Sequence, residues 1–147
     1  MKDTETPSKV ELLEQWFQRV WIEGDLDAVD EFFSDDAEAK GLLPEMRIGP
    51  QDYRDFVPLI LALVEDLKID LIINTEDNYW IQSLYKVTAR ATATSAPIVV
   101  LGQVSVKVQA NKFTEAYNCF DFMGLFEQLG QLPEQSMAIC LTGGTLS

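Results

Sequence analysis

Apolar residues near the start of the chain recur every three or four positions, as on one face of a helix. Ser8 and Glu11, which precede this pattern, have the spacing of a capping box at a helix N-terminus. A first helix is therefore predicted, and Gly24 is placed to end it in a left-handed conformation. Asp25 can cap a short second helix that extends to Phe33. The apolar face of the first helix consists of Val10, Leu13, Phe17 and Val20, with Leu12, Trp16 and Trp21 beside it.

A third helix is expected after Gly49, because Pro50 suits the first position of a helix. Pro58 lies inside this run, and its nitrogen cannot donate a hydrogen bond, so we expect a kink or a break there. The stretch 34–41, between the second and third helices, loses the helical period. The apolar face of the third helix would contain Tyr53, Phe56, Val57, Ile60, Leu61 and Val64.

From Lys68 onward the hydrophobic period changes from helical to alternating. The segments 69–73, 80–94 and 103–108 alternate in this way, and residues 109–112 form a plausible hairpin into a last strand that begins at Phe113. Three helices thus precede a sheet of about four strands, with no internal repeat. This segregation of helices from a largely antiparallel sheet predicts an α+β fold.

Length and composition fit one ordinary globular domain spanning residues 1–147. The formal net charge of -13 repels phosphate backbones and anionic lipid headgroups, so neither nucleic acid nor a membrane is expected as a partner. The acidity is interpreted as a contribution to solubility, with recognition of a basic partner as the alternative.

The first residues carry acids and no apolar stretch, so neither a signal peptide nor a membrane span is expected, and the predicted location is cytoplasmic. Cys119 and Cys140 lack the spacing of a zinc site or a redox pair and are expected to be free thiols. The chain has no histidine, which removes the commonest general base and transition-metal ligand. No metal or cofactor is predicted.

Two segments resemble the SnoaL-like branch of the nuclear transport factor 2-like superfamily. They are residues 21–37 (WIEGDLDAVDEFFSDDA) and residues 113–121 (FTEAYNCFD) followed by 124–130 (GLFEQLG). The resemblance covers roughly residues 8–133 and implies a cone in which three N-terminal helices pack on a curved sheet around a pocket. Residues 134–147 would form a C-terminal extension, either a cover over the domain or a disordered end.

The family includes polyketide cyclases, ketosteroid isomerases, limonene-epoxide hydrolases, dehydratases and non-enzymatic binding or dimerisation modules, so the resemblance implies a pocket and leaves the activity open. The three catalytic groups of the isomerases fall near Phe17, Gly41 and Leu101, and none of these residues can do that chemistry. The epoxide-hydrolase arrangement would need a second acid beside Arg90 on its strand, and there is none.

Asp121 is the main catalytic candidate, because it matches the acid–base aspartate of the SnoaL-type cyclases, which points into the cone. Apolar neighbours would make such a carboxylate a stronger base toward a proton beside a carbonyl group. Tyr117 could act as a hydrogen-bond donor beside it. The alternative is that Asp121 caps the helical segment from Gly124 to Leu129. In a regular last strand, Asp121, Tyr117 and Cys119 would share one face and Asn118 would lie on the other, unless a bulge near Asn118 changes this sorting.

Candidate ligand-binding residues are the bulky side chains expected around the pocket, together with possible polar anchors, although for each of them ordinary packing or solvent exposure is the competing interpretation. These candidates are Trp16, Phe17, Trp21, Phe56, Ile60, Trp80, Tyr85, Arg90, Asn118 and Cys119. Arg90 would anchor a substrate carboxylate or pair with Asp121, and it is otherwise a solvated charge.

Three functions remain open for this sequence. The first is a cofactor-independent enzyme, such as a cyclase, an isomerase or a hydrolase, that acts on a hydrophobic carbonyl compound. The second is a non-catalytic module that binds a hydrophobic small molecule. The third is a dimerisation domain, because a sheet face that contains Thr88, Arg90, Thr92 and Thr94 could form a homodimer interface.

Overall fold

The structure of the chain is a computed structural model that describes residues 7–40 and 49–146. Its first half contains α1 (Lys9–Trp16), the π-helix η1 (Phe17–Ile22), the short 3₁₀ helix η2 (Leu26–Ala28), α2 (Val29–Phe32), β1 (Phe33–Lys40) and α3 (Pro50–Leu61). Its second half contains β2 (Val64–Glu76), β3 (Trp80–Ala91), β4 (Pro97–Gln109), β5 (Lys112–Phe120), α4 (Phe122–Gln128) and α5 (Ser136–Leu141).

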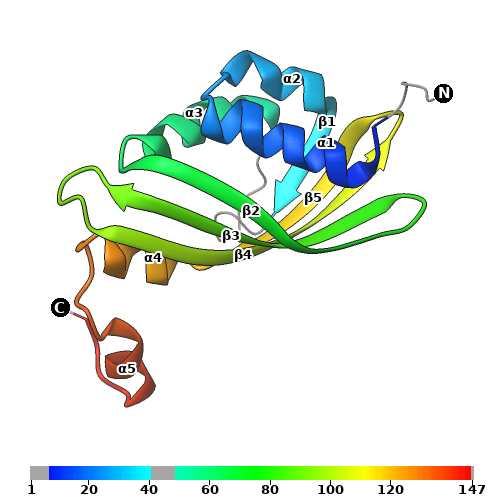
Figure 1. Cartoon of the computed structure of the whole chain (residues 1–147). Coiled ribbons are helices and arrows are strands. Elements are labelled where there is room, and N and C mark those ends of the chain that lie inside the picture. Colours follow the sequence, from blue (N-terminus) through cyan, green and yellow to red (C-terminus); the bar gives the residue numbers. More distant parts are fainter. Residues whose placement is uncertain (1–6, 41–48, 147) are drawn as a thin grey trace.

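The five strands form one curved sheet in the order β1-β5-β4-β3-β2. The β2–β3, β3–β4 and β4–β5 pairs are antiparallel, and the β1–β5 pair is parallel. Helices α1, α2 and α3 lie together over one face of the sheet (Figure 1). The α+β class and the helical cover are as predicted, and the expectation of a largely antiparallel sheet is met in part, because the β1–β5 pair makes the sheet mixed.

The strand β1 was not predicted, since residues 34–41 were expected only to lack helical periodicity. Phe33, which the sequence pattern assigned to the second helix, is instead the first residue of β1 and pairs with Phe113. A segment this acidic has little strand preference of its own, and its pairing with a strand far along the sequence decides its conformation. The sheet consequently has five strands among the described residues.

The predicted capping box is present at the start of α1. The Ser8 backbone nitrogen donates to Glu11 Oε1 at 2.8 Å, and the Glu11 nitrogen donates to Ser8 Oγ at 3.1 Å. Gly24 has a φ of 71°, in the left-handed region expected after a helix. Asp25 makes no side-chain cap; its carboxylate instead accepts a hydrogen bond from Arg19 at 2.9 Å.

The break expected at Pro58 does not occur, because α3 continues through it to Leu61. Pro58 lies on the exposed side of this helix, where water can hydrate the carbonyl group that the proline leaves without a donor. The helix ends earlier than predicted, and Val64 is the first residue of β2.

Phe113 lies at the centre of the packing between the helices and the sheet and is only 1% exposed. Its ring centroid is 6.0 Å from that of Trp16 in α1, 5.9 Å from Phe32 in α2 and 5.3 Å from Phe33 in β1. One buried side chain of β5 therefore joins three elements of the first half of the chain.

Helix α4 covers an edge of the sheet that would otherwise be open. The pairing of β5 with β4 begins at Gly102, so residues 97–101 of β4 extend beyond it. The side chain of Gln128 in α4 accepts from the Val99 nitrogen at 2.8 Å and donates to the Val99 oxygen at 3.0 Å. Leu125 packs beside Ile98 and Val100, so α4 both pairs with this edge and closes the end of the core.

Helix α5 stands away from the sheet near the C-terminus (Figure 1). The C-terminal extension that the sequence left as a cover or a disordered end therefore contains a helix, and Leu141 within it is 77% exposed. Across residues 7–40 and 49–146, the helices are all too short or too polar to cross a membrane.

Replacement of Phe113 by Ala should lower the free energy of unfolding by about 3–5 kcal/mol, because it removes a buried ring and leaves a cavity. Urea unfolding followed by circular dichroism measures this change. Tyr79→Ala is the matched control, since Tyr79 is 55% exposed, and it should change stability by less than about 0.5 kcal/mol. Equal effects of the two substitutions would contradict the central position of Phe113.

Candidate functional site

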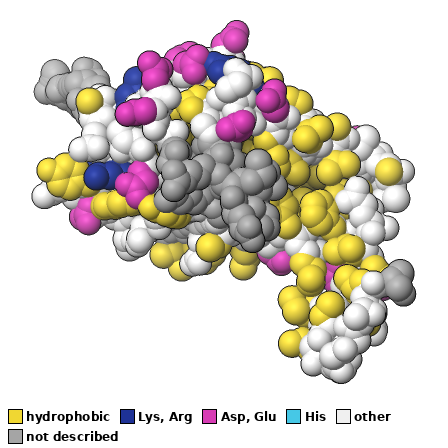
Figure 2. All heavy atoms as spheres, turned by 180° about the vertical axis from the view of Figure 1, so that it is seen from behind, with side chains coloured by type: hydrophobic (Ala, Val, Ile, Leu, Met, Phe, Trp, Pro, Cys, Tyr) yellow, Lys and Arg dark blue, Asp and Glu magenta, His cyan; other side chains and the backbone are white. Residues whose placement is uncertain are grey.

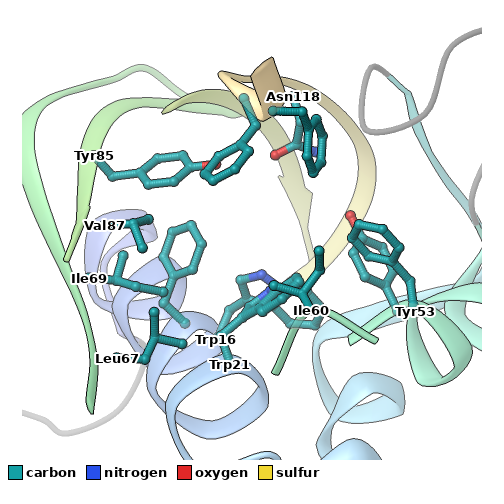
Figure 3. A pocket seen from close by; sticks show the side chains of 13 residues that line it. Trp16, Trp21, Tyr53, Ile60, Leu67, Ile69, Tyr85, Val87 and Asn118 are labelled. Atoms are coloured by element: carbon teal, nitrogen blue, oxygen red, sulfur yellow. The ribbon is translucent and has the colours of Figure 1, made fainter. Parts of the chain in front are cut away.

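An apolar cavity of about 80 Å³ lies between the helices and the covered face of the sheet (Figure 3). Among the described residues, thirteen line it; twelve of these are aromatic or aliphatic, and none of the thirteen carries a formal charge. The aromatic lining residues are Trp16, Phe17, Trp21, Tyr53, Phe56, Tyr85, Phe120 and Phe122. The others are Ile60, Leu67, Ile69, Val87 and the single amide, Asn118.

The π-helix η1 brings two tryptophans of the first helical segment to the same cavity. In an α-helix, Trp16 and Trp21 would point about 140° apart around the axis, because they are five positions apart. The wider turn of η1, in which the Glu23 nitrogen donates to the Gln18 oxygen at 2.9 Å, reduces the angle between side chains five positions apart. Both indole rings therefore line the cavity.

Tyr85 forms one wall of the cavity and is packed against the backbone of the next strand. It pairs with Gly102 across β3 and β4 and is 5% exposed. A Cβ atom at position 102 would lie only 2.5 Å from Tyr85 Cζ and 2.6 Å from its Oη. Only glycine at position 102 leaves the ring this space, and the ring then meets Phe17 with centroids 4.9 Å apart.

The polar groups of the cavity gather toward one end. In Figure 3, Tyr53 and Asn118 lie next to each other and the hydroxyl end of Tyr85 points toward Asn118, whereas Leu67 and Ile69 lie on the opposite side. Tyr53 is 3% exposed and Asn118 is 9% exposed. The cavity therefore has a neutral hydrogen-bonding end and an apolar end.

Burial raises the pKa of both cavity tyrosines well above the ordinary value. For Tyr53, the neighbouring Tyr85 adds to this rise, and a hydrogen bond with the Asn118 side chain opposes it. For Tyr85, the nearby Cys119 adds to the effect of burial. Both hydroxyl groups are consequently neutral at physiological pH, and they can exchange hydrogen bonds with a ligand without carrying a charge.

The expectation that Asp121 points into the cavity is wrong. Its side chain is exposed, and it caps α4 by accepting a hydrogen bond from the Gly124 nitrogen at 2.8 Å. Alternation along β5 turns Ala116, Asn118 and Phe120 inward, so Asp121, which follows, has the opposite direction. The capping role that the sequence left as the alternative is confirmed.

Tyr117, Cys119 and Trp80 also differ from the expected lining, because they belong to the opposite face of the sheet. Tyr117 is 40% exposed and donates a hydrogen bond to the Glu115 carboxylate, and Cys119 is exposed. The ring of Trp80 stacks with that of Tyr117, with centroids 6.3 Å apart, beside a groove on this outer face. The bulge in β5 lies at Thr114 and not near Asn118, so it leaves the inward direction of Asn118 unchanged.

Arg90 is a solvated charge at the end of β3, which is the alternative that the sequence analysis gave to a substrate anchor. Its side chain is 54% exposed and lies 3.8 Å from the Asp66 carboxylate, and it donates to the Ser95 carbonyl oxygen at 3.1 Å. These partners hold it at the turn between β3 and β4 and not at the cavity.

Seven of the expected ligand-binding residues line the cavity: Trp16, Phe17, Trp21, Phe56, Ile60, Tyr85 and Asn118. Six lining residues were missed: Tyr53, Leu67, Ile69, Val87, Phe120 and Phe122. Three of these had a signal in the sequence. Tyr53 shares the predicted helix face of Phe56 and Ile60, Val87 follows Tyr85 by two positions in a strand, and Phe120 follows Asn118 in the same way.

Over the described part of the chain, no group of three His, Cys, Asp or Glu residues is arranged to hold a metal ion. Gly41, which aligns with the base of the isomerases, lies outside the described residues.

The model of the SnoaL-like domain family matches residues 13–116, which is more than half of the chain. The chain belongs to the SnoaL-like domain family. A search of curated proteins finds no match. These two comparisons therefore assign a family to the chain and no activity.

Several solved structures of other proteins have the same fold as this SnoaL-like domain. TsrD from Streptomyces laurentii has a TM-score of 0.72 at 19% identity, covering 88% of this chain and 100% of its own. A candidate polyketide cyclase from Acidithiobacillus ferrooxidans has a TM-score of 0.70 at 22% identity, with coverage of 87% and 99%. A ketosteroid isomerase-like protein from Catenulispora acidiphila in complex with trimethylamine has a TM-score of 0.70 at 12% identity, with coverage of 86% and 95%. At these identities the likeness shows the fold alone.

The substitution Gly102→Ala should force the Tyr85 ring out of its place and lower stability by about 1–3 kcal/mol, as overpacking of a core does. Thermal unfolding measures the loss. Combining it with Tyr85→Leu, which removes the clashing ring atoms, should cost less than the sum of the two single substitutions. Strictly additive effects would show that the two residues do not compete for space.

The substitution Asp121→Ala should lower stability by about 0.5–2 kcal/mol, because α4 loses its N-terminal cap. Asp121→Asn should retain most of the stability, since an asparagine oxygen can also accept from the Gly124 nitrogen. Urea unfolding measures the stability of the two variants. If the role of Asp121 is purely electrostatic and not capping, Asn and Ala should lower the stability equally.

Proposed function

We propose that this SnoaL-like domain binds a small hydrophobic molecule in the cavity between its helices and its sheet. The observation that carries the proposal is a buried space walled by aromatic and aliphatic side chains, with Tyr53, Tyr85 and Asn118 as its hydrogen-bonding groups. Small-molecule sites combine these features, namely a mostly apolar lining and a few convergent polar groups. The fold shared with a candidate polyketide cyclase supports a ligand of low polarity.

Binding without acid–base catalysis is the role that this geometry favours. The lining residues in the part of the chain that the structure describes include no carboxylate, and the raised pKa values of Tyr53 and Tyr85 make their hydroxyl groups weak acids. A cyclase or isomerase that removes a proton beside a carbonyl group needs a base within reach of that proton. Asp121, the sequence candidate for this base, is occupied at the N-terminus of α4.

A cavity-filling substitution tests the proposed site. Val87→Phe should occupy the space and weaken binding of p-cresol, a small neutral aromatic probe, at least tenfold in isothermal titration calorimetry. The matched control is Gln82→Phe, at an exposed position of β3 whose side chain points to the other face of the sheet, away from Val99 and Leu101.

The control variant should bind p-cresol as the unmodified protein does. If the unmodified protein fails to bind the probe, or if Val87→Phe binds it unchanged, the cavity is not the site.

We also propose that the domain forms a homodimer through the outer face of its sheet. Val99 and Leu101 on this face are 54% and 48% exposed, and they lie near Lys86. A self-complementary interface needs such apolar residues, and basic side chains reduce the repulsion between two chains of net charge -13. The face expected earlier is corrected in part, since Thr92 and Thr94 lie in the turn after β3 and not on the strand.

Leu101→Glu should convert the dimer to a monomer in analytical ultracentrifugation, because it places a charge in the apolar part of the interface. Leu59→Glu is the matched control, since Leu59 is 66% exposed on α3, away from the sheet face, and it should leave the dimer intact. A monomeric unmodified protein at micromolar concentration would contradict the proposal.

A further inference from the structure

The volume of the cavity limits the size of its ligand. An apolar cavity of about 150 Å³ holds one benzene molecule, and the cavity here, at about 80 Å³, is smaller. A single six-membered ring therefore fills it completely and enters only with small displacements of the side chains that form its walls. Two fused rings need a much larger displacement.

The walls favour a flat ligand. Trp21 and Phe56 meet edge to face with centroids 6.1 Å apart, and Phe56 meets Phe122 in the same way at 6.4 Å. Rings held in these orientations present both faces and edges to the space between them, and a planar ring can stack on the faces and meet the edges. A flexible chain of the same size gains fewer such contacts and loses more conformational freedom.

The electrostatic surroundings favour a neutral ligand. Within residues 7–40 and 49–146, no lining residue carries a charge that could pair with a ligand carboxylate or ammonium group. Moving an unpaired charge into such an apolar space is strongly unfavourable, and the net charge of -13 further repels an anion.

The polar end of the cavity favours a ligand with one oxygen. The Tyr53 hydroxyl and the Asn118 amide both line the cavity at this end, and both residues are buried (Figure 3). Polar groups that are buried in this way need hydrogen-bond partners, and a neutral phenolic hydroxyl can donate its proton to one. A ligand oxygen at this end would receive that proton, while the ring of the ligand extends toward Leu67 and Ile69.

We propose that the cavity selects a neutral, single-ring compound that carries one hydroxyl or carbonyl oxygen, with that oxygen held by Tyr53 and Asn118. This inference rests on the proposed function and adds the class of ligand to it. It also makes Tyr53, which the sequence analysis did not single out for binding, the main determinant of specificity.

Four probes test the proposal by isothermal titration calorimetry. They are p-cresol, toluene, 4-methylbenzoate and 2-naphthol, which differ in the presence of oxygen, in charge and in the number of rings. The p-cresol probe should bind about three- to tenfold more tightly than toluene, as one hydrogen bond predicts. The charged probe and the two-ring probe should each bind at least tenfold more weakly than p-cresol.

Tyr53→Phe removes only the hydroxyl group and should reduce the affinity for p-cresol to that for toluene, with toluene binding unchanged. The comparison of the four probes on the unmodified protein stands even if this variant folds poorly. Equal binding of p-cresol and toluene would overturn the assignment of the polar end, and binding of 4-methylbenzoate or 2-naphthol as tight as that of p-cresol would overturn the limit on charge or size. Absence of binding by all four probes would overturn the proposed function itself.

Discussion

The contacts of four aromatic rings with Trp16 set the distance between the helices and the sheet. Trp16 meets Phe32, Phe33, Tyr53 and Phe113 edge to face, with ring centroids 5.8, 5.0, 5.2 and 6.0 Å apart. These rings come from α2, β1, α3 and β5, so a single side chain of α1 contacts four other elements. Rings of this size in this geometry cannot approach further, and the layers are therefore held apart.

The cavity is a consequence of that separation. Trp16 forms part of the cavity wall, and the sheet contributes smaller side chains to the opposite wall, such as Val87 and Ile69. Gly102 extends the space by letting the Tyr85 ring lie against the backbone of β4. Uncharged walls and a polar end at Tyr53 then determine what chemistry can occupy it. On the face seen in Figure 2, the acidic side chains gather mainly along the top of the molecule, and hydrophobic side chains cover much of the remaining surface.

Short sequence patterns were sufficient to predict the features that depend only on residues near one another in the sequence. The capping box at Ser8, the left-handed Gly24 and the hairpin between β4 and β5 each depend on neighbouring residues, and each is present, with Ala110 and Asn111 both at positive φ in that hairpin. The strand β1 could not be predicted in this way, because its conformation depends on pairing with β5 about 80 residues later. The effect of Pro58 on α3 likewise depends on which side of the helix faces water, and the sequence alone does not determine this.

The hydrophobic period of the sequence was sufficient to predict the apolar residues that line the cavity. It was not sufficient to predict whether a polar side chain points into the cavity or away from it. Trp16, Phe56 and Tyr85 face the cavity because they lie on the apolar sides of their elements. The direction of the Asp121 side chain depends on the alternation along β5 and on the turn into α4. The resemblance to the cyclases predicted that this carboxylate points into the cavity, but it caps α4 instead.

The three indole N–H signals in a ¹⁵N-correlated NMR spectrum test most directly whether the separated layers enclose a binding cavity. Trp16 and Trp21 line the cavity, and Trp80 lies on the outer face of the sheet, so the chain carries two reporters and one internal control. On addition of p-cresol, we expect the Trp16 and Trp21 signals to shift and the Trp80 signal to stay in place. A shift of Trp80 alone, or of no indole signal at a saturating concentration of the probe, would contradict the enclosed cavity as the binding site.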